Sequence, residues 1–235
     1  MKLKRTLMIL LILCLISLPA LAENGLKVTG TATVTLKANR AILYLGVSTV
    51  EDSLSDAQEN NNQRIAAVMT ALTDTLMIPA ERIATTEFNI YTVSEWQEQA
   101  KKEVTRFQVR HMLSIISDDI SAAGHIIDTA VEAGANVVNY VEFTSTLMSG
   151  AYDEALKSAT EEAKRKAQIL ADAAEVRLGA ITAVDNTGYS QTYGVSNRMT
   201  ADMKAEAAGQ STQLSPGMLS VTASVTVTWD IRDED

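Results

Sequence analysis

Alternating apolar and polar residues mark two long strands near opposite ends of the chain. From Leu26 to Leu36 most apolar residues occupy every second position, and threonines fill most of the positions between them. The same period of two runs from Leu219 to Ile231. Such alternation is typical of a strand with one buried and one wet face. Because a long unpaired strand invites aggregation, we expect these two segments to pair in one antiparallel sheet.

The middle of the chain alternates between strand and helix patterns. The strand patterns cover residues 40–50, 83–93, 104–117 and 137–146. Apolar residues at helical spacing predict one helix that begins after Ser53, in a capping box with Asp56, and ends before Pro79. A second helix is closed by Gly134, and either Ser117 or Asp118 can cap it. This order predicts two strand–helix–strand units, hence an α+β fold of antiparallel sheets with helices packed on one face.

A long alanine-rich helix is predicted over residues 151–176. Alanine recurs at every fourth position in its centre, at residues 155, 159, 163, 167 and 171. Such a ridge of small side chains lets a neighbouring element approach closely. We favour a ridge that faces the core of the same chain, and a seam between two copies is the alternative.

Two polar stretches carry aromatic residues and are candidates for a contact loop. Residues 186–217 are rich in Gly, Ser, Thr and Gln, and we expect a long mobile loop there, which either orders against a neighbouring subunit or stays disordered. Residues 95–103 read as a polar hairpin connection. Exposed aromatic side chains often make contacts, so Trp96, Tyr189 and Tyr193 are the candidate contact residues.

The first 22 residues read as a secretory signal peptide. A basic start is followed by an apolar run from Leu7 to Leu18, and Ala20 and Ala22 form a small-x-small cleavage pattern. We expect cleavage after Ala22, which leaves one domain over residues 23–235. An uncleaved anchor is the alternative, but the run is shorter than the ~20 residues that a spanning helix needs. The exported chain then works in the periplasm or at the cell surface, without stable membrane insertion.

Composition narrows the classes of function. The whole chain has a net charge of −9, and the signal peptide would remove three basic residues and no acidic one. An acidic chain lacks the basic stripe of a nucleic-acid-binding protein. The one cysteine, Cys14, lies within the signal and comes too early for a lipoprotein signal. The exported chain therefore has neither disulfides nor a cysteine-based metal site.

Candidate chemistry is sparse. His111 shares a strand face with Val109 and Leu113, which favours a hydrogen-bonded core histidine, and His125 has no metal-binding companion. Helix capping explains the neighbouring Asp118 and Asp119 better than a carboxylate pair does. Serine-hydrolase, phosphate-loop and dinucleotide-binding motifs are absent from the sequence. We therefore predict no catalytic, cofactor or metal residues and no enzymatic activity, while an unrecognised hydrolase stays a rival reading.

Several segments together resemble a known family. They are Val28–Ala32, Ala38–Ala41, Ile83–Tyr91, Ile126–Ala135, the helix Glu154–Ala174 leading into Leu178–Gly179, and Pro216–Gly217. These segments resemble the SIMPL-domain family, which includes bacterial periplasmic immunogenic proteins and oxidative-stress defence proteins. The chain departs from the usual pattern where Ala38–Asn39 stands in place of Pro-Asp.

The resemblance implies a function without naming a reaction. It implies an exported α+β protein that self-associates, in some members into large rings, with roles in envelope integrity, stress tolerance or antigenicity. It supplies no catalytic residues. The leading hypothesis is a non-enzymatic, homo-oligomeric envelope protein whose partner is itself. The alternative is an extracytoplasmic module that binds a peptide, glycan or small molecule.

Overall fold

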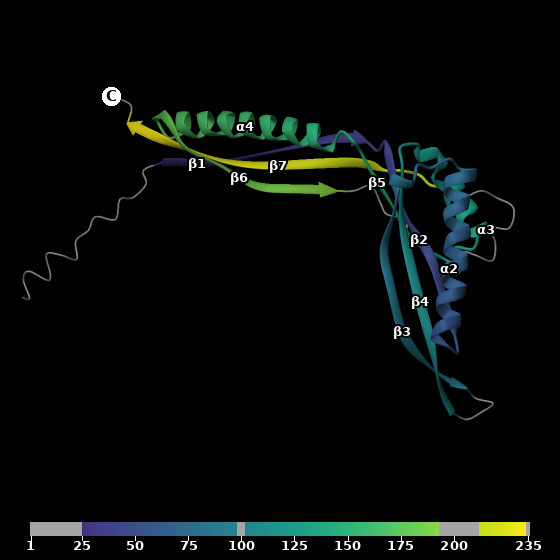
Figure 1. The fold of residues 1–235 in the computed structure, drawn as a ribbon. Helices are drawn as coiled ribbons and strands as arrows, with labels where there is room; N and C mark the ends of the chain where they lie inside the picture. The colour runs from purple at the N-terminus through teal and green to yellow at the C-terminus, as the bar shows by residue number, and fades with distance from the viewer. Residues whose placement is uncertain (1–24, 98–101, 193–211, 234–235) are drawn as a thin grey trace, which may run out of the picture.

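The structure, a computed structural model, forms an L of two lobes, each a sheet covered by helix (Figure 1). It describes residues 25–97, 102–192 and 212–233. The predicted signal peptide with Ala20 and Ala22, and the aromatic Tyr193, lie outside these ranges. The sheets have strand orders β1-β7-β6 and β3-β4-β2-β5, with antiparallel pairing throughout. The expected α+β class is therefore confirmed.

The elements follow one another as the hydropathy patterns predict. The strands are β1 Gly25–Lys37, β2 Arg40–Glu51, β3 Ile83–Gln97, β4 Lys102–Ser117, β5 Val137–Thr144, β6 Val176–Thr192 and β7 Met218–Asp233. The helices are α2 Leu54–Thr70, α3 Ala123–Glu132 and α4 Met148–Ala173. A π-helical turn, Ala71–Thr75, extends α2, and two 3-10 turns cover Ala80–Arg82 and Ile120–Ala122. The two strand–helix–strand units are β2-α2-β3 and β4-α3-β5.

The first and last strands of the described chain, β1 and β7, form an antiparallel pair along the whole length of β1. β1 and β7 pair from Gly25 opposite Asp230 to Lys37 opposite Met218, without a register shift. Apolar residues of both strands point to one face, where Val225, Val227 and Trp229 are buried. Hydroxyls share the other face, and Thr29 and Thr226 meet there at 2.8 Å between their Oγ1 atoms. The predicted pairing of the two ends is confirmed.

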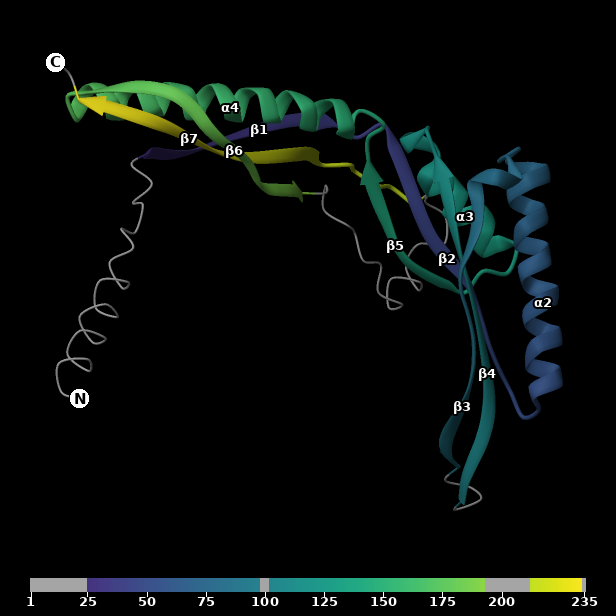
Figure 2. The ribbon, with the colours of Figure 1, turned by 60° about the vertical axis from the view of Figure 1, so that its left-hand side comes forward.

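The alanine ridge of α4 packs on the apolar face of this sheet. All of its alanines are fully buried, namely Ala155, Ala159, Ala163, Ala167 and Ala171. Small side chains bring the helix so close that a β-carbon at Gly30 would overlap the backbone of Ala159 and Ala163. The reading of a ridge that faces its own core is confirmed (Figure 2).

The four-stranded lobe holds the larger core. Leu43, Leu45 and Val47 of β2 lie fully buried beneath α2 and α3. The Ser53 hydroxyl accepts a hydrogen bond from the N–H of Asp56 and caps α2, as the sequence predicts. The buried Asn61 of α2 donates to the Val47 and Val109 carbonyls, each at 3.2 Å, and so ties the helix to the centre of the sheet.

The cap before α3 differs from the expected one. Neither Ser117 nor Asp118 caps a helix; the Asp119 carboxylate accepts from the N–H of Ser121 at the start of the 3-10 turn. Asp118 instead forms ion pairs with Arg40 at 2.7 Å and Arg82 at 2.6 Å. The capping role proposed for the two aspartates is right for Asp119 and wrong for Asp118, because the two arginines converge on the latter.

The expected loop over residues 186–217 is shorter than predicted. Its first part continues β6 to Thr192, paired with β7. Its last part, residues 212–217, lies against the four-stranded lobe, where Asp128 of α3 accepts both the N–H and the hydroxyl of Thr212. Residues 193–211 lie outside the described residues. Similarly, β3 and β4 extend into most of the expected connection at 95–103.

Candidate interaction surface

The long strand β3 forms one edge of the four-stranded sheet. It pairs with β4 on one side, and the strand order leaves its other side as the border of the sheet. One register shift occurs between Thr85 and Glu87, and from Glu87 to Gln97 the pairing with β4 is regular. An edge of this length presents a row of backbone N–H and C=O groups to a further strand.

Apolar side chains flank this edge. Phe88 and Ile90 lie opposite His111 and Val109 of β4, so they belong to the face that the helices cover. Yet Phe88 is 47% and Ile90 40% exposed. The cause is the position of α2, which packs on β2 and β4 and leaves β3 uncovered. The β3–β4 hairpin also runs past the end of α2 in both views (Figures 1 and 2).

His111 links the apolar flank to the core. Its Nε2 lies 3.0 Å from the Thr85 hydroxyl, and its ring meets the Phe88 ring edge-on at 5.3 Å between centroids. Burial lowers the pKa of the imidazole below its usual range. Nδ1 is buried and has no hydrogen-bond partner in the described part of the chain. The expected hydrogen-bonded histidine is thus found at the boundary of the core.

The outer edge of β1 is closed by two side chains of α4. The Glu162 carboxylate accepts the backbone N–H of Thr31 at 2.6 Å, and the Lys166 ammonium donates to the carbonyl of Thr29 at 3.3 Å. Glu162 and Lys166 also pair with each other at 3.3 Å. The Thr31 hydrogen bond, followed by Lys166, holds the pKa of Glu162 below its usual range. A strand that added here would have to displace both side chains.

The remaining two edges are less regular or shorter than β3. β6 has three register shifts against β7, and bulges of this kind twist an edge away from further pairing. β5 spans eight residues and carries a register shift against β2. Apart from β1, whose border is occupied by Glu162 and Lys166, β3 therefore offers the longest regular border among the described strands.

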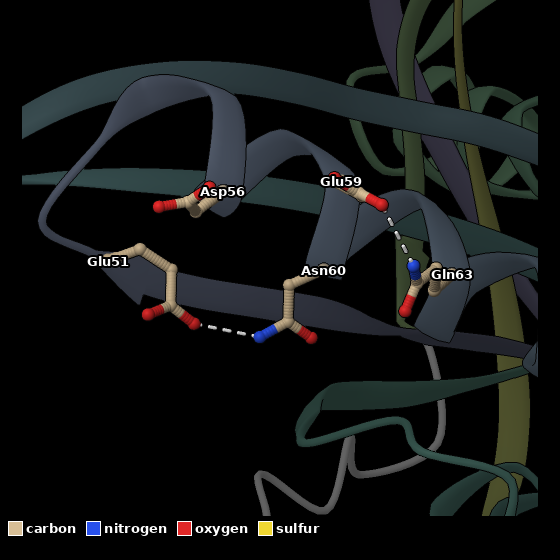
Figure 3. Close-up of a pocket in the computed structure, with 5 residues that line it drawn as sticks. All are labelled: Glu51, Asp56, Glu59, Asn60 and Gln63. Atoms are coloured by element: carbon tan, nitrogen blue, oxygen red, sulfur yellow. Dashed lines mark hydrogen bonds between the residues drawn. The ribbon is translucent and has the colours of Figure 1, made fainter.

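A shallow acidic hollow lies at the start of α2 (Figure 3). Glu51, Asp56, Glu59, Asn60 and Gln63 line it. Asn60 donates to Glu51 at 2.7 Å and Gln63 to Glu59 at 3.3 Å, so the amides already satisfy part of the carboxylates. In residues 25–97, 102–192 and 212–233 there is no group of three or more His, Cys, Asp or Glu side chains arranged to hold a metal ion. The hollow reads as a solvated acidic surface.

The candidate contact residues do not form one loop. Trp96 lies near the end of β3 and is 63% exposed. Tyr189 lies in β6 of the other sheet, 51% exposed, and its ring packs edge-on against Tyr152 at 4.5 Å between centroids. The expectation of a loop position was wrong for both, because strand pairing extends further than the polar composition indicated. Whether either residue contacts a ligand stays a prediction.

Sequence reasoning missed Phe88, Ile90 and the Glu162–Lys166 pair. Period-two alternation places Phe88 and Ile90 on one strand face, but it does not reveal that α2 packs on β2 and β4 rather than on β3. Glu162 and Lys166 show only an i,i+4 ion pair of the sort found on many solvated helices.

Comparison with known proteins decides the family. The family SIMPL, described as "Protein of unknown function (DUF541)", matches residues 26–229. The chain belongs to the SIMPL family. The match covers both lobes, from Leu26 in β1 to Trp229 in β7. The SIMPL domain therefore includes the paired end strands as well as the two strand–helix–strand units.

Two similar proteins carry a common description. The 26 kDa periplasmic immunogenic protein of Brucella melitensis biotype 1 (strain ATCC 23456 / CCUG 17765 / NCTC 10094 / 16M) is 26% identical over 229 residues, which cover 92% of this chain and 91% of that protein. The protein of the same name from Brucella abortus (strain S19) shows the same identity and coverage. Within the described residues of this SIMPL chain, none of the helices combines the length and apolarity required to cross a bilayer.

Proposed function

We propose that this protein is exported to the periplasm and acts there through homo-oligomeric assembly, without catalysis. The observation that carries the proposal is the long regular border of β3 with its exposed apolar flank. The export signal in the sequence and the periplasmic naming of the similar Brucella proteins support the location.

Exposed apolar side chains on edge strands support contact with another chain. Each lobe has a helix layer on one sheet face, and several of the large apolar side chains that stay exposed lie on edge strands, with Phe88 and Ile90 on β3 and Ile181 and Val184 on β6. Exposed apolar residues that gather at one place mark interaction sites more often than scattered ones do. Assembly would cover Phe88 and Ile90, and a stress-tolerance role would follow from a coat or ring in the envelope.

Analytical ultracentrifugation of the exported chain tests the assembly. We expect a species of higher mass than the monomer at micromolar concentration, and negative-stain images of discrete closed particles. A monomer at every concentration examined would contradict the proposal. For the physiological role, a strain that lacks the chain should lose viability under peroxide, and the restored gene should return it.

A further inference from the structure

We propose that β3 pairs antiparallel with β3 of a second copy about a two-fold axis at Ile90, which joins the two four-stranded sheets into one. This inference rests on the proposed self-assembly and names the surface that performs it. The β3 border is long, regular from Glu87 to Gln97 and flanked by exposed apolar side chains.

The β3 border lacks the devices that keep sheet edges apart. From Phe88 to Ser94 there is no charged residue, no proline and no glycine, and the pairing with β4 is regular throughout. Segments of six or seven residues with high β-propensity and no charge add readily to another strand. Natural proteins usually place lysine, proline or a bulge on such an edge, so a border this plain indicates that something covers it in the working protein.

The chemistry of the border favours a second copy of this chain. The whole chain carries a net charge of −9, so two copies repel one another through most of their surfaces. The run from Phe88 to Ser94 carries no charged side chain, so two copies do not repel each other there. Two such runs are complementary to each other, since each supplies a neutral edge and apolar side chains.

Symmetry restricts the register, and charge favours Ile90 over Tyr91 as the residue on the axis. In an antiparallel pair related by a two-fold axis, opposite side chains point to the same sheet face, so their residue numbers are both even or both odd. One residue therefore lies on the axis, opposite the same residue of the second copy. With Ile90 on the axis, Phe88 faces Thr92, Asn89 faces Tyr91 and Glu87 faces Val93. With Tyr91 on the axis, Glu87 would face Glu95, and like charges directly opposite each other are destabilising. With Ile90 on the axis, Glu87 faces the uncharged Val93 of the second copy instead.

This arrangement covers the exposed flank of β3. The two-fold axis stands perpendicular to the joined sheet, so both copies of α2 lie on the same face. Phe88 then lies opposite Thr92 of the second copy and diagonal to its Ile90, within reach of an aromatic ring. Phe88 and Ile90 of both copies, which α2 leaves exposed in one chain, would then lie on the joined sheet between the two α2 helices.

Disulfide trapping tests the register. Opposite residues in an antiparallel pair have Cα atoms about 4.5–5.5 Å apart, which suits a disulfide. The exported parent chain, without an introduced cysteine, is the blank. Under mild oxidation Ile90→Cys should form a covalent dimer, Phe88→Cys alone should not, and a mixture of Phe88→Cys and Thr92→Cys chains should form the mixed dimer. Dimers from Asn89→Cys or Tyr91→Cys instead would overturn the Ile90 axis.

A charge substitution separates this inference from the assembly proposal. Ile90→Lys places two ammonium groups opposite each other, so we expect a loss of the dimer in sedimentation. Val184→Lys, on the bulged β6 edge, should leave the dimer intact, and equal melting temperatures would show that both variants fold. An Ile90→Lys chain that keeps the parent's mass overturns the β3 interface while assembly stands. A monomeric parent overturns both.

Discussion

Gly30 of β1 lies directly beneath Ala159 of α4, so close that a β-carbon would overlap the helix backbone. The helix cannot yield locally, because its whole alanine ridge is buried on the same sheet. We therefore expect Gly30→Ala to lower the free energy of unfolding by about 1–3 kcal/mol, the usual cost of overpacking. Urea titration measures it.

A second glycine provides the matched control for this substitution. A β-carbon at Gly150, in the first turn of α4, would meet nothing within 4 Å. Gly150→Ala should raise stability by up to about 0.5–1 kcal/mol, because alanine is the better helix former. Equal effects of the two substitutions would show that the close approach at Gly30 has no energetic weight.

The free energy of unfolding should depend on the chemistry of the Asn61 side chain more than on its volume. Its amide nitrogen donates to two strand carbonyls, while its oxygen is buried without a partner in the described part of the chain. Asn61→Leu should cost about 1–3 kcal/mol through the lost hydrogen bonds. Asn61→Asp should cost more, since it brings a carboxylate against carbonyl oxygens in the core.

Chemical denaturation of both variants tests the order. Asn62→Asp, one residue along the helix and exposed, introduces the same charge at the surface and should be nearly neutral. If Asn61→Leu proved more damaging than Asn61→Asp, packing rather than hydrogen bonding would dominate at this position.

His111 should make stability depend on pH near neutrality. Its folded-state pKa lies below the usual 6.5 because burial disfavours the imidazolium. Between the two values the unfolded chain binds a proton that the folded chain does not, so stability is fully present above about pH 6.5 and is lost as the pH falls towards the folded pKa. The melting temperature should drop between pH 7.5 and about 5.5.

His111→Gln should flatten this part of the melting profile. His125→Gln, in which the exposed histidine of α3 is changed instead, should keep the profile of the parent. A parent profile that is already flat between these pH values would contradict the role given to burial of His111.

The Thr212 anchor should hold the segment before β7 against α3. Asp128 accepts two hydrogen bonds from Thr212, one from the backbone and one from the hydroxyl at 2.6 Å. Asp128→Ala should therefore speed amide hydrogen exchange over residues 212–217, with protection in β7 unchanged. Exchange at the parent rate would show that the packing of Leu214 suffices to hold the segment.

The Glu162–Lys166 pair should protect the β1 edge from unwanted pairing. With both residues changed to alanine, the Thr31 N–H and the Thr29 carbonyl lose their partners, and we expect faster aggregation in thioflavin and light-scattering assays. Glu161→Ala with Lys164→Ala alters the same charges on exposed positions of α4 and should aggregate like the parent.

The fold was predictable because its signals are local. Period-two alternation locates β1 and β7, helical spacing locates α2 and α3, and Ser53 and Gly134 mark ends that the structure keeps. The limits of β6 were not predictable, because Asn186 and Gly188 have weak strand propensity and residues 186–192 are held by pairing with β7. Tertiary pairing overrode composition there.

The candidate surface depends on relations that one sequence does not display. Whether Phe88 is covered depends on how far α2 reaches across the sheet. The closure of the β1 edge depends on Glu162 meeting a backbone N–H 131 residues away in sequence. Likewise, Asp118 and Asp119 are equivalent in the sequence, and only the approach of Arg40 and Arg82 separates their roles.

The carboxylate and ammonium that α4 lays along β1 have a consequence for the size of any particle this chain builds. A protomer that exposed two equally receptive borders would polymerise without limit, as fibres do. Here side chains of α4 occupy part of the β1 border, so once two copies join through β3, the edges that remain are the occupied β1, the bulged β6 and the short β5. Growth by further strand addition is therefore disfavoured.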